Sequence, residues 1–398
     1  MRRRRSPTRR DNGRASMEVG HLSWSQSAGW RVEELAQGKP DVILYFGSRE
    51  MLACGSRYGE LRAMFPDAAI LGCTTGGQIR GDDIFDDEIS AVAMRFDATA
   101  IKLACETANS ALDSRAAGRS IGEKLQGSDL AGIFVLSDGL NVNGSELVAG
   151  ITERVGAHVP VTGGLAGDGA KFEQTLVGAD CPPRSHAVAA IGFYGNAIRI
   201  GHGSAGGWDV FGPRRRITRS DGNILFELDG EPALDLYERY LGDEAKGLPG
   251  SALLFPLQIN DPRHPEHTVV RTVLAIDRER RTMTFAGDMP EGWVAQLMRG
   301  NFTQLAEGAA EAARQARAGL AEAKDRNGVA VLVSCIGRRL LMRQRTTEEI
   351  EAAGAELGAR LQYLGFYSYG EISPHAESGI CELHNQTMTV TTITEAAA

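Results

Sequence analysis

The stretch AGIFVLSDGLNVNGSELVAGITERVGAHVPVTGGLAGDGAKFEQTLV, residues 131–177, carries the pattern that decides the fold. One apolar run, 133–136, ends in Ser137-Asp138-Gly139, and a second, 159–162, ends in Gly163-Gly164. Between them, residues 146–155 place apolar side chains at helical spacing, so the stretch predicts strand, loop, helix, strand and loop. This order is typical of an α/β sheet, in which loops at the carboxyl ends of strands form the ligand crevice.

Polar and glycine residues in these loops are therefore candidates for a ligand site. Carboxylates and amides would fix the orientation of a ligand, and glycines would let backbone N–H groups approach it. The alternative is that these are ordinary turn residues, since Asp, Asn and Gly are common in turns of any kind. The candidates are Asp138, Asn143, Gly163, Gly164 and Asp168.

The same pattern occurs nearer the amino terminus. The run DVILYF, residues 41–46, predicts a buried parallel strand, and a helix is expected over 50–64 because Pro66 ends the periodic segment. The next strand, 69–73, ends in Thr74-Thr75-Gly76-Gly77, another polar, glycine-rich loop. Thr74 and Thr75 therefore join the candidate site.

The remaining segments predict a mixture of parallel and antiparallel strands flanked by helices. Residues 89–96 and 100–106 alternate like an antiparallel pair, and 185–194 with 197–202 predict a hairpin across Gly195-Asn196. Helices are expected over 302–323 and 347–357, the second with Thr346 as N-cap and Glu349 completing a capping box. The fold class is thus α/β with mixed sheets.

Composition excludes several classes of partner. The chain has 398 residues and a net charge of −8. Residues 1–16 hold seven Arg and one Asp, or +6, which leaves about −14 for the remainder. An acidic body argues against nucleic acid, which requires a basic face. No apolar run approaches the roughly 20 residues of a membrane span. We expect an Arg-rich, disordered tail over 1–30, or an extension upstream of a true start at Met17.

The cysteines and short motifs give no catalytic or metal site. No two of the six cysteines have C-x-x-C spacing, so we expect free thiols and a cytoplasmic protein. GHGSAG, residues 201–206, matches G-x-G-x-x-G, but Pro213 and a turn follow where a nucleotide fingerprint needs a helix. HPEH, residues 264–267, is interpreted as a surface loop because prolines flank it.

One further cluster lies near the carboxyl terminus. GFYSYGEISP, residues 365–374, ends a strand in an aromatic loop, and CELHNQTMTV, 381–390, places a His at the start of the last strand. Tyr369, Glu371, His384 and Asn385 are its candidates for ligand contact. A buried His could ligate haem, but it could equally bond a backbone carbonyl.

The ordered set of segments resembles the FIST family of bacterial sensory domains. The matching segments cover roughly residues 40–393 and include DVILYFGS (41–48), ILGCTTGGQI (70–79), VLSDGLNVNG (135–144), VTGGLAGDG (161–169), IGHGSAGGWDVFGP (200–213), ELDGEPALDLYERYLG (227–242), GFYSYGEISP (365–374) and LHNQTMT (383–389). The resemblance implies an N-terminal domain over 31–230 and a C-terminal domain over 231–394. It also implies a ligand-sensing protein of signal transduction, whose ligand would be an amino acid or a similar polar metabolite.

Three functions remain open at this point. The first is a cytoplasmic small-ligand sensor that acts through a separate partner such as a histidine kinase. The second, also implied by the resemblance, is a haem-based nitric-oxide sensor with His384 or His202 as the axial ligand. The third is an enzyme that uses Asp138 and Asp168. No cofactor other than haem is expected.

Overall fold

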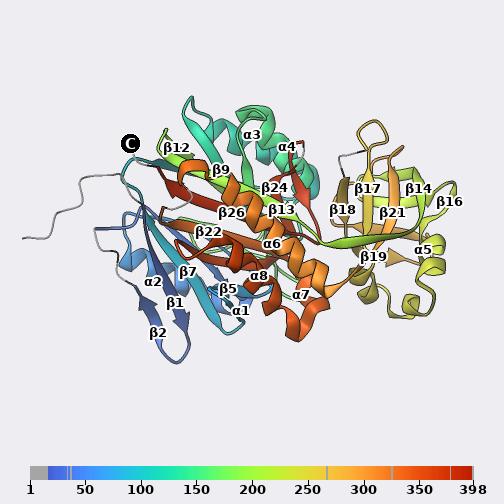
Figure 1. Cartoon of the computed structure of the whole chain (residues 1–398), viewed down its shortest axis with the longest axis horizontal. Coiled ribbons are helices and arrows are strands. Elements are labelled where there is room, and N and C mark those ends of the chain that lie inside the picture. Colours follow the sequence, from blue (N-terminus) through green and yellow to red (C-terminus); the bar gives the residue numbers. More distant parts are fainter. Residues whose placement is uncertain are drawn as a thin grey trace, which may run out of the picture.

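The computed structural model describes residues 17–33, 35, 38–265, 268–323, 326–376 and 378–396. The Arg-rich head, residues 1–16, lies outside them, as do Glu266 and His267 of the HPEH motif. The described residues form three six-stranded sheets and one eight-stranded sheet (Figure 1). The sheets mix parallel and antiparallel pairs and carry helices, which confirms the predicted α/β class.

The six-stranded sheets are named here after a central strand of each. The β3 sheet has the order β11 (Val177–Ala179), β4 (Ala69–Thr74), β3 (Val42–Gly47), β7 (Glu88–Arg95), β1 (Glu18–Ser25), β2 (Gly29–Val32). The β9 sheet has the order β25 (Cys381–His384), β24 (Gly370–Pro374), β10 (Val161–Leu165), β9 (Leu130–Ser137), β12 (Ala187–Tyr194), β8 (Ala100–Thr107). The β22 sheet has the order β13 (Ile198–Ala205), β26 (Met388–Glu395), β22 (Gly328–Cys335), β23 (Leu361–Ser368), β5 (Gln78–Arg80), β6 (Asp83–Phe85).

Each of these sheets contains a parallel pair of strands joined by a helical crossover. β3 and β4 are joined by α1 (Arg49–Leu52) and α2 (Ser56–Met64), and β9 and β10 by α4 (Gly144–Val155). β22 and β23 are joined by α7 (Ile336–Met342) and α8 (Thr347–Leu357). The single helix predicted over 50–64 is interrupted because Gly55 has a left-handed φ of 73°.

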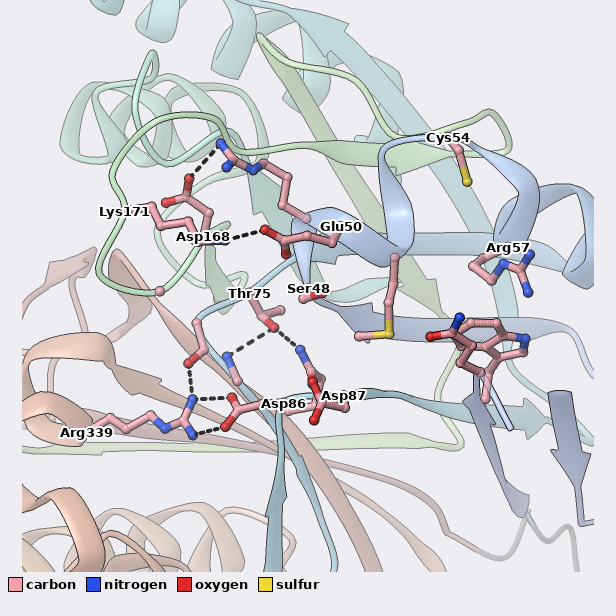
Figure 2. A pocket seen from close by; sticks show the side chains of 18 residues that line it. Ser48, Glu50, Cys54, Arg57, Thr75, Asp86, Asp87, Asp168, Lys171 and Arg339 are labelled. Atoms are coloured by element: carbon pink, nitrogen blue, oxygen red, sulfur yellow. Dashed lines mark hydrogen bonds and ion pairs between the residues drawn. The ribbon is translucent and has the colours of Figure 1, made fainter. Parts of the chain in front are cut away.

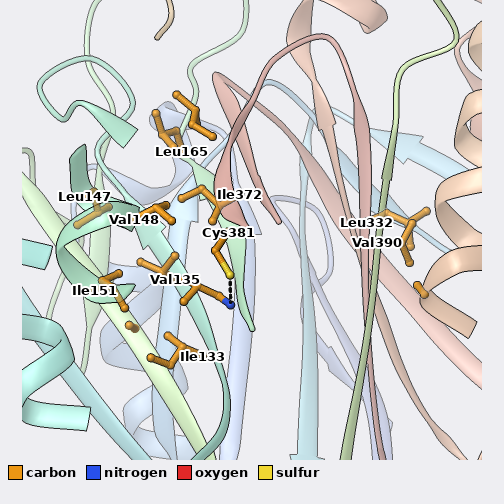
Figure 3. Packing of buried hydrophobic residues seen from close by; sticks show 14 of the residues in the cluster. Ile133, Val135, Leu147, Val148, Ile151, Leu165, Leu332, Ile372, Cys381 and Val390 are labelled. Carbon is orange, nitrogen blue, oxygen red and sulfur yellow. Dashed lines mark hydrogen bonds between the residues drawn. The ribbon is translucent and has the colours of Figure 1, made fainter. Parts of the chain in front are cut away.

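The three sheets share one core. Along β9, Phe134 and Leu136 face this common core, as strand alternation requires. Ile133 and Val135 face the opposite way, toward α4 (Figure 3) and α3 (Ser114–Leu125). On the β22 sheet, α6 (Phe302–Ala318) and α8 cover the outer face, including Leu332 and Val390. The β3 sheet packs α1 and α2 against its own outer face.

Residues 208–300 form a separate module with its own core, seen on the right of Figure 1. Its sheet has the order β18 (Thr268–Arg271), β17 (Leu257–Asn260), β21 (Val294–Gly300), β14 (Trp208–Asp221), β15 (Ile224–Leu228), β20 (Thr282–Phe285), β19 (Val273–Asp277), with β16 (Glu231–Pro232) on β15. Helix α5 (Ala233–Leu241) and the 3-10 turn η3 (Gly250–Leu254) complete it. The β9 sheet, the β22 sheet and the sheet of the module each contain strands from both sides of residue 230, the expected boundary between the two domains.

Two predicted strand pairings are wrong. β7 pairs with β1 and β3, whereas β8 pairs with β12 in a different sheet. Likewise β12 lies in the β9 sheet and β13 in the β22 sheet, where β13 pairs with β26. The short connections at 96–99 and 195–197 pass between sheets instead of closing hairpins, because each strand finds a distant partner.

The glycines of GHGSAG serve packing. A Cβ on Gly201 would overlap the carbonyl oxygen of Ala316 in α6, and one on Gly203 would overlap that of Ala312. The motif lies on strand β13, so no helix begins on it, as the sequence indicated. Within the described residues, no helix is long and apolar enough to cross a membrane.

The predicted capping box of α8 is wrong. Thr346 makes no side-chain cap to α8, and Glu349 is fully buried in an ion pair 2.8 Å from Arg338. The Arg338 guanidinium also donates to the carbonyls of Gly206 and Leu305, which lie on the two segments that lead into and out of the 208–300 module. Tertiary pairing has therefore replaced the local cap.

Candidate functional site

A polar cavity of about 1080 Å³ lies at the carboxyl ends of β3, β4 and β10 (Figure 2). Three loops form it: residues 48–57 after β3, Thr75 to Gln78 after β4, and Asp168 to Lys171 after β10. Residues from three other parts of the chain close the sides of the cavity. They are Trp24 and Gln26 from β1 and the turn after it, Asp86 and Asp87 from the turn before β7, and Arg339 from α7. The crevice expected at the ends of the strands is thus present, built from two of the predicted loops and one that was not predicted.

The loop after β4 forms the floor. The Thr75 hydroxyl lies 2.6 Å from the Gln78 amide, whose oxygen also accepts from the Ser48 backbone N–H at 3.2 Å. The Gln78 amide nitrogen in turn donates to the carbonyls of Phe85 and Glu88. Gly77 has a φ of 131°, and a Cβ there would overlap the Arg339 guanidinium. The glycine therefore lets an arginine 263 positions away bind the Gly76 carbonyl.

Charges of both signs line the cavity in equal number. The cations are Arg49, Arg57, Lys171 and Arg339, and the anions are Glu50, Asp86, Asp87 and Asp168. Most are already paired: Lys171 with Glu50, and Arg339 with Asp86 at 2.7 Å (Figure 2). The hydrogen bond from Lys171 lowers the pKa of Glu50. Ion pairs that are partly exposed to solvent stabilise the folded protein by only about 0–1 kcal/mol each. A charged ligand can therefore take the place of one partner in such a pair.

Asp168 organises the wall of the cavity. Its carboxylate accepts hydrogen bonds from the backbone N–H groups of Phe172, Glu173 and Gln174 at 2.9–3.1 Å and from the Tyr369 hydroxyl. Arg49 lies 3.3 Å from the same carboxylate and 2.7 Å from Glu173, and the bond to Glu173 raises the pKa of Arg49. Asp168 therefore positions Arg49, whose side chain is 19% exposed.

Tyr369 contacts the cavity wall from behind Asp168. Burial, with the bond to Asp168, raises the pKa of its hydroxyl, and its ring stacks on Phe172 with centroids 4.5 Å apart. Of the cluster predicted near the carboxyl terminus, Tyr369 alone is joined to the loop after β10. It lies behind Asp168 and does not line the polar cavity itself.

The loop after β9, predicted as part of the same site, lies outside the polar cavity. The Asp138 carboxylate accepts from the backbone N–H groups of Leu140, Asn141 and His186, from the Asn141 amide and from the Thr175 hydroxyl. Burial of Asp138 opposes its ionisation, but these hydrogen bonds prevail and lower its pKa. These hydrogen bonds hold the loop together. Asp138 therefore agrees with the alternative interpretation, in which it is an ordinary turn residue. The Asp138 and Asp168 pair gives no support to the enzyme hypothesis.

Asn143, Gly163, Gly164 and Thr74 also have structural partners. Asn143 caps α4 by accepting from the N–H groups of Ser145 and Glu146. A Cβ on Gly163 would overlap the Val135 carbonyl, and one on Gly164 would lie 2.7 Å from Val333. The Thr74 hydroxyl accepts from the Leu176 N–H at 3.0 Å. These residues keep the strands and loops close together and do not line the polar cavity.

Glu371, His384 and Asn385 lie together on β24 and at the end of β25, away from the polar cavity. Burial raises the pKa of Glu371 to about 8, and its carboxyl group bonds Ser368 and Thr387. Burial lowers the pKa of His384, whose Nε2 lies 3.0 Å from the Ser373 carbonyl oxygen. The Asn385 side chain bonds the His384 carbonyl and the Thr272 N–H. Within residues 365–385, Tyr367 and Tyr369 contact the loops that form the polar cavity. The Tyr367 backbone bonds Gly76 and Gly77, and the Tyr369 hydroxyl bonds Asp168.

His384 does not fit haem. The Nε2 of His384 is engaged by a carbonyl, and the cavity beside it measures about 240 Å³, below the roughly 300–1,000 Å³ of ordinary ligand pockets. His202 lies on β13 opposite Thr391, and burial lowers its pKa. Within the described part of the chain, no group of three or more His, Cys, Asp or Glu is arranged to hold a metal ion.

Of the residues that line the cavity, only Thr75 and Asp168 were predicted as site residues from the sequence. Ser48, Arg49 and Glu50 directly follow a buried strand, so the same criterion that selected Thr74 and Asp168 would have found them. Arg339 lies in a helix far along the chain, and no local signal marks it.

The protein therefore has a mixed α/β fold with an inserted module and a polar cavity at the ends of parallel strands. Two family models match the chain: the FIST N domain over residues 41–231 and the FIST C domain over residues 233–374. The chain belongs to the FIST family, whose domains are sensory domains of signal transduction that bind small ligands. An uncharacterised protein of Methanocaldococcus jannaschii is 23% identical over 203 residues. That match covers 46% of this chain and 36% of the relative, so it spans about a third of the relative's length.

Proposed function

We propose that this protein is a cytoplasmic sensor that binds a small zwitterionic metabolite, such as an amino acid, in the polar cavity. The observation that carries the proposal is the equal number of cationic and anionic side chains lining one cavity at the ends of parallel strands. A zwitterion presents one carboxylate and one ammonium group, so it can exchange with a pair such as Lys171–Glu50 without leaving a net charge.

Arg49 is the proposed carboxylate-binding residue. Its guanidinium is held by Asp168 and Glu173, and a planar guanidinium favours bidentate binding of carboxylates. Thr75 and Ser48 supply hydroxyl groups in the same cavity. The signal would pass to a separate partner protein, such as a histidine kinase.

A thermal-shift screen with the common amino acids tests the proposal. A ligand at a hundredfold excess over its Kd should stabilise the protein by about 2.7 kcal/mol. The variant Arg49→Met should weaken Kd by about 10- to 100-fold, since a hydrogen bond to a charged group is lost. Arg119→Met is the matched control, because Arg119 pairs with Glu153 away from the cavity. Equal ligand shifts in both variants, or no shift with any amino acid, would contradict the proposal.

A further inference from the structure

A second cavity of about 800 Å³ adjoins the polar one and has a different chemistry. It shares Gly76, Gly169 and Arg339 with the polar cavity, so these residues mark the boundary between the two. Its walls are apolar and come from two parts of the molecule. Phe172, Leu340 and Leu341 belong to the main body, and Leu253 and Leu254 to η3 of the 208–300 module.

The charge lining the second cavity has one sign. Two arginines, Arg339 and Arg343, line it, and none of its described lining residues is a carboxylate. Arg339 is already neutralised by Asp86, with both of its terminal nitrogens 2.7–2.8 Å from that carboxylate. Arg343 is exposed at the end of α7, and no ion pair of Arg343 is found among the described residues. It therefore supplies the cavity with a cation whose charge is not offset.

We propose that this second cavity is a binding site for an aliphatic or aromatic monocarboxylate. The apolar part of the ligand would lie against the leucines and Phe172, and its carboxylate would pair with Arg343. A cavity of this size lined mainly by apolar side chains, with a few polar groups to fix orientation, is typical of small-molecule sites. A ligand with only an ammonium group would place that group beside Arg343, whose charge is not offset, and this repulsion disfavours it.

Such a ligand would contact η3 together with α7 and the loop after β10. Gln386 already joins η3 to the main body through the Leu253 carbonyl at 3.2 Å. Binding in the second cavity would therefore strengthen the contact between the module and the main body. This site does not depend on the function proposed for the polar cavity, because no ligand is needed there for the monocarboxylate to bind.

Isothermal titration of the full chain with hexanoate, octanoate and decanoate tests the inference. Burial of each added methylene should tighten Kd by up to about fourfold, and octylamine should bind at least tenfold more weakly than octanoate. Arg343→Gln should weaken octanoate binding at least tenfold. Arg343 has a left-handed φ of 51°, and glutamine meets the same backbone restriction, so the substitution isolates the charge.

Two further variants complete the test. Arg345→Gln is the matched control, since Arg345 is exposed nearby but pairs with Glu348. Leu340→Glu should abolish octanoate binding by adding a like charge to the wall. Equal octanoate affinities in Arg343→Gln and Arg345→Gln, equal binding of octylamine and octanoate, or no saturable heat would each overturn the inference. Loss of amino-acid binding in Arg49→Met with octanoate binding intact would separate this site from the polar cavity.

Discussion

At the scale of single residues, the same chemical group has different roles according to what surrounds it. Asp138 and Asp168 both lie in loops that follow strands, and both accept hydrogen bonds from their own loops. Asp168 also meets Arg49 and so shapes the polar cavity, whereas Asp138 meets only the loops at 139–141 and 175–186. Both carboxylates are fully engaged in hydrogen bonds, so their position relative to the cavity, and not the residue type, distinguishes them.

Glu371 makes a residue-scale prediction about pH. Burial raises its pKa from 4.5 to about 8, so the folded state keeps a proton that the unfolded state releases. The free energy of unfolding should therefore fall as pH rises from about 4.5 to 8, by on the order of 5 kcal/mol in total. In Glu371→Gln this contribution should be absent. Urea unfolding at pH 5 and pH 8 measures it, and an unchanged difference between the two pH values in the variant would refute the assignment.

At the scale of elements, close packing depends on glycines in strands. Strand β13 can lie directly beneath α6 because Gly201 and Gly203 present no side chain to the Ala316 and Ala312 carbonyls. The sequence pattern that imitates a nucleotide fingerprint is thus explained by a contact between a helix and a strand. The same reason applies to Gly77, whose missing Cβ leaves room for Arg339.

Gly203→Ala is predicted to destabilise the protein by about 1–3 kcal/mol, because the new methyl group would push α6 away from β13. Gly59→Ala is the matched control. Gly59 lies in α2, where an added Cβ meets nothing within 4 Å, so that variant should gain up to about 1 kcal/mol from helix propensity. Urea midpoints of the two variants measure the difference. A Gly203→Ala protein as stable as the parent would contradict the packing explanation.

At the scale of the whole molecule, the 208–300 module is an insertion between two parts of one body. β13 leads into it and α6 follows it, and its first and last residues, Trp208 and Gly300, are paired across an antiparallel ladder. None of its described residues lines the polar cavity, but η3 lines the apolar one. The apolar cavity therefore depends on the module for part of its lining, whereas the polar cavity does not.

Replacing residues 209–299 by an Asn-Gly dipeptide tests this division. Two residues of this type close an antiparallel pair, so Trp208 and Gly300 should remain paired and the main body should unfold cooperatively. Arg338 would keep its bonds to the Gly206 and Leu305 carbonyls, which lie outside the deletion. Circular dichroism and calorimetry should show a cooperative transition, with octanoate binding lost. A non-cooperative melt would show that the body needs its module.

The sequence by itself determined the local elements and the family. Helical and strand periodicity are properties of neighbouring residues, so the strands at 42–47, 69–74 and 130–137 and the polar loops that follow them could be predicted. The segments of the FIST pattern are likewise contiguous. Thr75 and Asp168 were correctly placed at strand ends, because a strand end is visible in the chain itself.

Only the tertiary structure decided which strands pair, which loops meet and which polar groups remain free. β7 and β8 are close in sequence but lie in different sheets, since strand pairing depends on partners far along the chain. Arg339 reaches the Gly76 carbonyl across 263 positions, and no pattern within either segment encodes that contact. The polar cavity, its balanced charges and the apolar cavity beside it arise from such long-range contacts, which is why local sequence alone could not place them.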